Sequence, residues 1–202
     1  MKYKIAFLSA ILTGLVASPS LPAHAGGVIA TGAAVVPPSG FIHFCIKHSE
    51  ECLVSGQAAV RMELTPVRQG ELREVQARIN AAIEPREDPR HLWEYARDGR
   101  GDCNTFALTK RRALIALGWP EETLLLAAVY TEHNEGHLVL VARTSQGDLV
   151  LDNRLPRIVE WTVLPYRWVS MQSQTSPARW VRVTSESVAT ADSGQNAAVT
   201  LR

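Results

Sequence analysis

Residues 99–117 read Gly-Arg-Gly-Asp-Cys-Asn-Thr-Phe-Ala-Leu-Thr-Lys-Arg-Arg-Ala-Leu-Ile-Ala-Leu, and this stretch predicts a long helix that begins at Cys103. Turn-forming residues precede Cys103, and Gly118 and Pro120 supply the stop. Apolar side chains recur at helical spacing and predict the buried face: Phe106, Ala107, Ala113, Leu114 and Leu117. The basic side chains of the same helix are expected on its exposed face: Lys110, Arg111 and Arg112.

The regions on either side of this helix differ in character. Before it, residues 66–83 follow a Thr65-Pro66 helix start with near-helical apolar spacing, and residues 90–98 around Trp93 are expected to form a short helix. After it come β-branched or aliphatic runs separated by turns, at residues 123–131, 137–144 and 149–152, with 163–170 and 178–183 as candidates for two more. These runs predict consecutive antiparallel strands. Helices followed by strands predict an α+β fold.

The ends of the chain suggest export and a single domain. Residues 1–25 combine two lysines, an apolar stretch and Ala23-His24-Ala25, which is typical of a cleaved signal peptide. An uncleaved anchor is the alternative, although about a dozen apolar residues are few for a hydrocarbon layer of about 30 Å. Residues 26–40 are expected to be a tether, 41–184 the domain, and 185–202 a disordered tail without periodicity. No later segment approaches the length of a membrane span.

The charge balance argues against nucleic acid as a partner. The chain has 21 basic and 20 acidic residues, and two of the basic ones, Lys2 and Lys4, lie in the expected signal peptide. The remaining basic residues are not gathered into a stripe with aromatic residues. A near-neutral chain without such a stripe lacks the electrostatic surface that binds phosphate backbones or anionic lipid.

The three cysteines divide most simply into one disulfide and one free thiol. Export would place them in an oxidising compartment, where exposed thiols tend to pair. Cys45 and Cys52 lie in one short polar segment, whereas Cys103 lies about fifty residues later. Any other pairing would leave the unpaired thiol in that short segment, where no surrounding residues suggest a catalytic role for it. We therefore predict a Cys45–Cys52 disulfide and a free Cys103.

Three residues could form a nucleophilic site. Cys103 opens a helix, where unpaired N–H groups and the helix dipole favour a thiolate. His137 begins a predicted strand, and alternation places it on the face of Val139 and Val141, where we expect the helix to pack. Asp152 ends the next strand, from which a carboxylate can orient an imidazole.

Each of these residues also has an ordinary structural interpretation. Cys103 could be a small buried residue at a helix start, and His137 a surface residue beside a turn. Asp152 together with Asn153 could simply begin a turn. His133 is a rival for the base, but it stands in a loop with less to fix its direction.

Residues 99–110 (Gly-Arg-Gly-Asp-Cys-Asn-Thr-Phe-Ala-Leu-Thr-Lys), 136–140 (Gly-His-Leu-Val-Leu) and 149–153 (Leu-Val-Leu-Asp-Asn) resemble, in this order, the bacterial transglutaminase-like cysteine peptidases. The segment around Trp93 and the loop between Cys45 and Cys52 also fit, so the resemblance covers most of residues 38–170. It implies an α+β, papain-like or transglutaminase-like core with a triad of Cys103, His137 and Asp152. It also implies a thiol-dependent peptidase that cleaves a protein substrate through an acyl-enzyme thioester.

The resemblance extends to calcium-dependent periplasmic proteases that cleave large surface adhesins and hold the ion with acidic residues around the nucleophile. Those proteases resemble Asp-Cys-Glu-Asp, whereas this chain has Asp102-Cys103-Asn104-Thr105. Two carboxylates are missing, and Ca²⁺ prefers several charged oxygen ligands. We therefore expect no cofactor and no metal ligands, with calcium as the alternative. The expected location is periplasmic or secreted, and the expected partner is a protein or peptide substrate, such as a cell-surface or periplasmic protein.

Two other functions use the same residues. A transglutaminase-type protein-glutamine acyltransferase would let an amine, rather than water, attack the thioester. A peptide-binding module would keep the groove without turnover. The sequence does not place the oxyanion donors, for which the Cys103 backbone N–H is a candidate.

Overall fold

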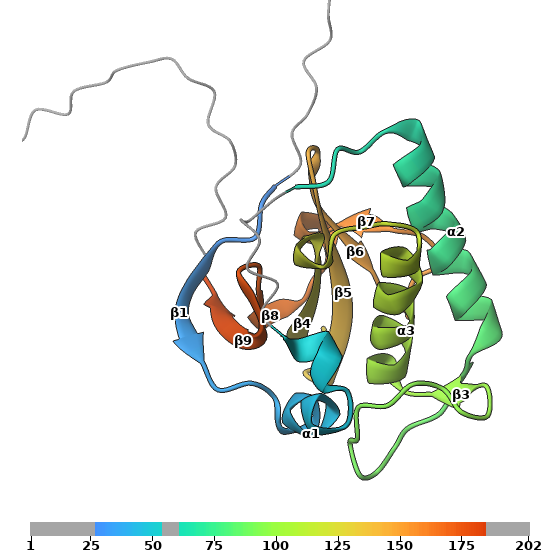
Figure 1. Ribbon diagram of the computed structural model, residues 1–202, viewed down its shortest axis with the longest axis vertical. Helices are drawn as coiled ribbons and strands as arrows, with labels where there is room; N and C mark the ends of the chain where they lie inside the picture. The colour runs from blue at the N-terminus through green and yellow to red at the C-terminus, as the bar shows by residue number, and fades with distance from the viewer. Residues whose placement is uncertain (1–26, 54–60, 185–202) are drawn as a thin grey trace, which may run out of the picture.

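The computed structural model describes residues 27–53 and 61–184, and its centre is a seven-stranded antiparallel sheet (Figure 1). The strand order is β1-β9-β8-β4-β5-β6-β7. The strands are β1 (Thr31–Val35), β4 (Leu124–Tyr130), β5 (Gly136–Thr144), β6 (Gly147–Leu151), β7 (Val159–Glu160), β8 (Arg167–Ser173) and β9 (Ser176–Val183). A second, parallel pair joins β2 (Glu84–Pro85) to β3 (Arg100–Gly101). The helices are α1 (Ser39–Lys47), α2 (Pro66–Ala82) and α3 (Cys103–Ala116), with short 3₁₀ helices η1 (Ser49–Cys52), η2 (Glu121–Thr123) and η3 (Trp161–Val163).

The predicted α+β arrangement is confirmed. The three runs predicted as consecutive strands form β4, β5 and β6, which pair antiparallel in chain order. Of the described residues, no helix has the length and apolarity needed to cross a bilayer. The predicted signal peptide (1–25) and disordered tail (185–202) lie outside the described residues.

The sheet has two apolar faces, and the helices cover one of them. Side chains of α1, α2 and α3 share a core with Leu126 of β4 and with Leu138 and Leu140 of β5. The alternate residues, among them Val139 and Val141, pack on the opposite face with β8. This period-two alternation explains why β5 is apolar almost throughout.

Local sequence fixes the two long helices. Pro66 stands at the start of α2, and the Thr65 side chain accepts a hydrogen bond from the Arg68 N–H. Asp102 caps α3 by accepting hydrogen bonds from the N–H groups of Asn104 and Thr105. Both helices begin where a capping side chain satisfies otherwise unpaired amides, and both were predicted within a residue of their observed ends.

Four local predictions were wrong. Leu117, expected on the buried face of the long helix, is 42% exposed at the end of α3. Residues 31–35, expected in the tether, form β1, which pairs with β9. Residues 90–98 are not helical, because His91, two residues after Pro89, adopts a φ of 51° and so interrupts any helical turn. Lys110 and Arg111 are buried (0% and 4% exposed), since α3 lies between the sheet, α2 and η1 and keeps only a narrow exposed side.

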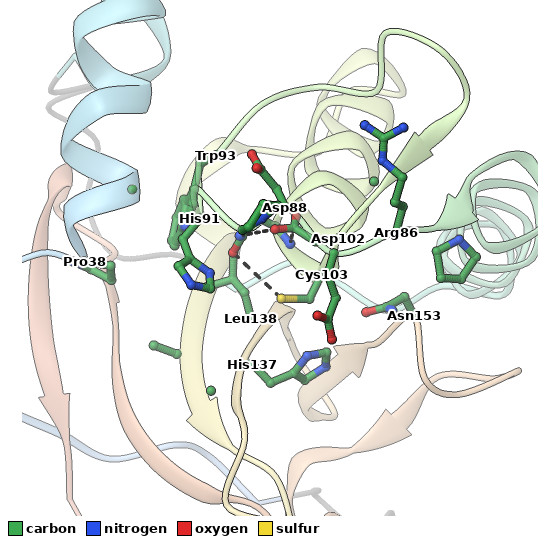
Figure 2. A pocket seen from close by; sticks show the side chains of 18 of the residues that line it. Pro38, Arg86, Asp88, His91, Trp93, Asp102, Cys103, His137, Leu138 and Asn153 are labelled. Carbon is green, nitrogen blue, oxygen red and sulfur yellow. Dashed lines mark hydrogen bonds between the residues drawn. The ribbon is translucent and has the colours of Figure 1, made fainter.

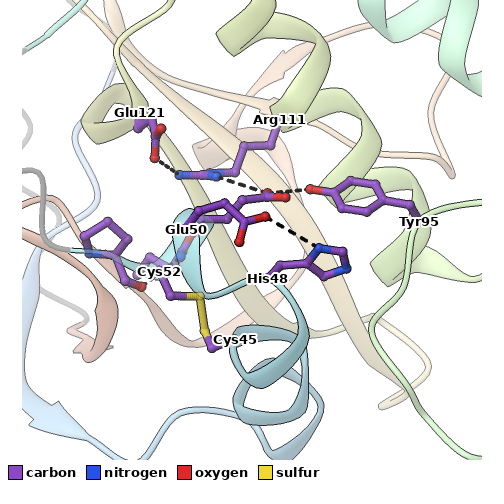
Figure 3. The surroundings of a disulfide bond; sticks show 10 residues. Cys45, His48, Glu50, Cys52, Tyr95, Arg111 and Glu121 are labelled. Atoms are coloured by element: carbon purple, nitrogen blue, oxygen red, sulfur yellow. Dashed lines mark hydrogen bonds and ion pairs between the residues drawn. A yellow bond between two sulfur atoms is a disulfide. The ribbon is translucent and has the colours of Figure 1, made fainter.

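The predicted Cys45–Cys52 disulfide is present and joins α1 to η1 (Figure 3). Closing so short a loop stabilises the fold by about 2–3 kcal/mol, mainly by restricting the unfolded chain. The same corner is tied to α3 by Glu51, whose carboxylate accepts hydrogen bonds from the Tyr95 hydroxyl and from Arg112. The disulfide therefore holds α1, which borders the site described below, against the helix that carries Cys103.

Candidate active site

Cys103 is the first residue of α3 and the free cysteine of the chain's described part. The capping bonds from Asp102 Oδ1 go to the backbone N–H groups of Asn104 (3.0 Å) and Thr105 (3.2 Å), so this cap does not use the Cys103 N–H. The turn before the cysteine packs closely on the helix. A Cβ atom at Gly101 would lie 2.4 Å from Thr105 Cβ, so a larger residue there would push the Cys103 turn away from its position.

His137 lies between Cys103 and Asp152. Its Nε2 is 2.9 Å from Asp152 Oδ1, and Cys103 is the other side chain that acts on the ring. Figure 2 shows the Cys103 and His137 side chains next to each other at the base of a pocket. Because Nε2 faces the carboxylate, Nδ1 is the ring nitrogen left for the sulfur. Burial alone would lower the pKa of His137, but the hydrogen bond to Asp152 and the interaction with Cys103 outweigh it and raise the pKa to about 9.

Asp152 is buried and fully engaged. Its side chain is 0% exposed. Oδ2 accepts a hydrogen bond from the Tyr166 hydroxyl (2.7 Å), and Oδ1 accepts one from the Arg154 N–H (2.9 Å) as well as facing His137. Burial would raise the pKa of this carboxyl, but its bond to His137 and the charge of that ring hold the pKa below the ordinary value. Asp152 is therefore an anion that can orient an imidazolium.

Side chains of α2 hold the backbone at Asp152. Gln76 Nε2 donates to the carbonyl oxygens of Asp152 and Leu155, both at 2.7 Å. Asn80, one turn later, donates to the same two oxygens at 3.4 and 2.9 Å. These contacts fix the segment that follows β6, and they join residues more than seventy positions apart, so no local pattern could have revealed them.

The structure brings the three predicted residues together, but for a different reason from the one expected. Val139 and Val141 pack on the face of β5 away from α3, so shared alternation with them does not carry His137 to the helix. The contact is made instead at the start of β5, where the strand emerges beside the first turn of α3. The rival His133 is excluded from this group, because its side chain is 70% exposed and lies 3.6 Å from Glu132.

A cavity of about 680 Å³ opens over Cys103 (Figure 2). Its walls come from segments far apart in the sequence: residues 38–40 before and within α1, residues 85–89 with His91 and Trp93, the turn at 101–104, and residues 136–138. The lining mixes charges, with Arg86, Glu87 and Asp88 on one loop. Trp93, further along the same segment, is the lining residue here that the sequence analysis also named. Trp93 is buried and packs edge-on against Phe41 of α1, which fixes the loop beside the cysteine.

The 102–105 segment offers few charged oxygens to a calcium ion. Asp102 is the one carboxylate of the 102–105 segment, and its oxygens are already bound by the first turn of α3, including the Asn104 side-chain amide at 2.9 Å. The side-chain oxygen of Asn104, Oδ1, instead lies 3.9 Å from Cys103 Sγ. In the described residues, the group of three side chains that could converge on an ion lies elsewhere, at His48, Glu50 and Glu51 beside the disulfide (Figure 3).

Comparisons with known proteins identify the family and the fold. Residues 31–188 match the sequence profile of the bacterial transglutaminase-like cysteine proteinases (BTLCP). No curated protein matches the sequence significantly. Among solved structures, calcium-bound LapG of Legionella pneumophila is similar at 24% identity and a TM-score of 0.51, over 61% of this chain and 75% of that one.

Two further LapG structures from the same organism are also similar. The first has 25% identity and a TM-score of 0.49, over 59% of this chain and 71% of that one. The second, from EGTA-treated protein, has 26% identity and a TM-score of 0.46, over 54% of this chain and 64% of that one. The likeness to the calcium-bound form supports the fold, and the profile match over most of the chain supports the chemistry of a cysteine peptidase with a protein substrate. The chain belongs to the family of bacterial transglutaminase-like cysteine proteinases.

Proposed function

We propose that this peptidase is exported and cleaves its protein substrate with Cys103 as nucleophile, His137 as general base and acid, and Asp152 as the orienting carboxylate. The observation that carries the proposal is the position of the His137 ring, which lies beside Cys103 (Figure 2) and 2.9 Å from Asp152 Oδ1. Export rests on the signal-like character of residues 1–25 and implies a periplasmic or secreted enzyme.

The reaction follows from where the proton lies. With a pKa of about 9, His137 is protonated at neutral pH. We take Cys103, at the N-terminus of α3, to be the matching thiolate before substrate binds. The thiolate attacks the peptide carbonyl carbon, and the Cys103 N–H is the proposed donor to the resulting oxyanion. As the C–N bond breaks, His137 gives its proton to the leaving amine and a thioester remains. His137 then takes a proton from water, the hydroxide attacks the thioester, and the freed sulfur leaves as thiolate.

Chemical modification tests the nucleophile. Iodoacetamide should add to Cys103 alone in the folded protein, because Cys45 and Cys52 are joined, and one adduct per chain should abolish cleavage. Peptide mapping by mass spectrometry locates the adduct, and labelling of new N-termini in cell-envelope proteins of the native host reports cleavage. Cleavage that persists in fully alkylated protein would remove Cys103 from the mechanism. Incorporation of a labelled primary amine, in place of new N-termini, would assign acyl transfer instead.

Calcium is the cofactor on which this chain is expected to differ from calcium-bound LapG. Because Asp102 is used as a helix cap and Asn104 and Thr105 supply no charge, we expect cleavage to be unchanged, within about twofold, after EGTA treatment and after addition of Ca²⁺. The measurement is the rate of substrate cleavage together with calorimetric titration of Ca²⁺ into the chelated protein. A stoichiometric, micromolar calcium site whose removal stops cleavage would contradict this prediction.

A further inference from the structure

Lys110 is a buried basic side chain to which the mechanism above gives no role. It is 0% exposed, and its Nζ has no hydrogen-bond partner among the described residues. Nζ lies 5.8 Å from the centre of the Phe106 ring, one turn earlier on α3. An ammonium group without hydrogen bonds in a protein interior is costly, so its presence needs a reason other than packing. The sequence prediction had placed this side chain in solvent.

The position of Lys110 points towards the triad. Lys110 follows Cys103 by seven residues, which is about two helical turns, so both side chains lie on the same side of α3. Helical side chains lean towards the N-terminus of their helix, and the contact with Phe106 shows that the Lys110 chain does so. Of the charged groups in the described part of the chain, Asp152 is the one whose charge acts on Lys110.

The other described elements packed around this site bring no unpaired charge. The Tyr166 hydroxyl donates to Asp152 Oδ2, and the Arg154 guanidinium that donates to this hydroxyl is paired with Glu132. The side chains that α2 sends to the Asp152 backbone, Gln76 and Asn80, are amides. The start of β5 contributes His137, which is already paired with Asp152. On α3 itself, the titratable group facing the site is Cys103.

The charges of the triad suggest a role for Lys110. With the proton on His137, the resting triad has two anions, Asp152 and the Cys103 thiolate, and one cation. A buried site with an unbalanced negative charge tends to take up a proton, and that proton would quench either the nucleophile or the orienting carboxylate. We propose that Lys110 is a positioning residue that supplies the second cation and so keeps Asp152 and Cys103 ionised as the pH falls. The inference rests on the proposed function, because it takes the triad as given.

The properties of Lys110 suit this role better than those of an arginine. Burial lowers the pKa of Lys110 to about 7, and the attraction of Asp152 acts in the opposite direction. Lys110 therefore becomes charged below neutral pH, where Asp152 and Cys103 are most easily protonated. Above neutral pH it is largely uncharged. An arginine would stay charged at every pH and would oppose the proton on His137.

The test is the pH dependence of Cys103 alkylation by iodoacetamide, measured in the wild type and in Lys110→Met, which keeps an unbranched apolar stem. We expect the acid limb of the rate profile to move up by about one pH unit, so that the rate at a fixed pH on that limb falls about tenfold. The alkaline limb should stay in place, because Lys110 is neutral there. The matched control is Leu114→Ala, a fully buried apolar change on the same helix, which should lower the melting temperature without moving either limb.

A folded Lys110→Met protein whose acid limb coincides with that of the wild type would overturn the proposal. A second measurement tests the proposal if Lys110→Met does not fold. The chain has only four lysines, Lys2, Lys4, Lys47 and Lys110, so the ¹³Cε signal of Lys110 can be followed by NMR. Its titration should move to lower pH in Asp152→Asn, because the attraction of the carboxylate is lost; an unchanged titration would also overturn the proposal. Both readouts are independent of peptide cleavage, so they can fail separately from the proposed function.

Discussion

Replacing His137 by Gln is expected to lower kcat for cleavage by about 10⁶-fold, the loss seen when the base of a comparable triad is removed. Glutamine keeps a polar side chain of similar length but neither takes the thiol proton nor delivers one to the leaving amine. The hydrogen bond to Asp152 Oδ1 can persist through the glutamine amide, so the buried carboxylate is not left unpaired and the fold should survive. Cleavage kinetics and circular dichroism of the same preparation separate the two effects.

His133→Gln is the matched control for this experiment. The same substitution four residues earlier removes an imidazole that is 70% exposed and bound only to the side chain of Glu132 among the described contacts. We expect its activity and melting temperature to equal those of the wild type. If His137→Gln kept more than a tenth of the wild-type rate, or if His133→Gln were the inactive variant, the base would have been misassigned.

The sequence predicted those elements that are determined by residues close to them in the chain. The start of α3 follows from a capping aspartate, and the β4–β5–β6 meander follows from apolar runs separated by turns. The disulfide followed from the spacing of two cysteines. In each case the residues that determine the feature lie within a few positions of it, so the pattern is visible along the chain.

What sequence reasoning missed depends on contacts between distant segments. Tyr166, which donates to Asp152, and Gln76, which holds the Asp152 backbone, are ordinary residues until the fold brings them to the site. The burial of Lys110 was missed because a basic residue beside two arginines is typical of a solvated helix face. Strand β1 was missed because its partner, β9, lies at the other end of the domain.

Asp152 is the second residue whose loss should have a large effect. Asp152→Ala is expected to lower kcat by about 10⁴-fold, less than the loss at His137, because the base remains but its tautomer and direction are no longer fixed. Asp152→Asn should lose less, since the amide oxygen can still accept a hydrogen bond from the ring. A second effect of Asp152→Asn is expected in the pH dependence of the reaction. Without the carboxylate charge, burial dominates and the pKa of His137 should fall from about 9, which shifts the alkaline limb of the cleavage rate to lower pH because the leaving amine needs a protonated His137.

Asp148 provides the control, because it lies near the opposite end of β6 and is equally buried. Its carboxylate accepts a hydrogen bond from the Ile29 N–H at 2.8 Å and binds Arg61 at 3.2 Å, contacts that hold the chain before β1 to the sheet. Asp148→Ala should therefore cost stability by leaving these donors unpaired, while the remaining folded protein keeps its kcat and its alkaline limb. The effects of two buried aspartates, one within β6 and one directly after it, would then differ: Asp152 would act on the rate and Asp148 on the melting temperature. Equal losses of kcat in both variants, in proportion to their stability, would mean that Asp152 only supports the fold.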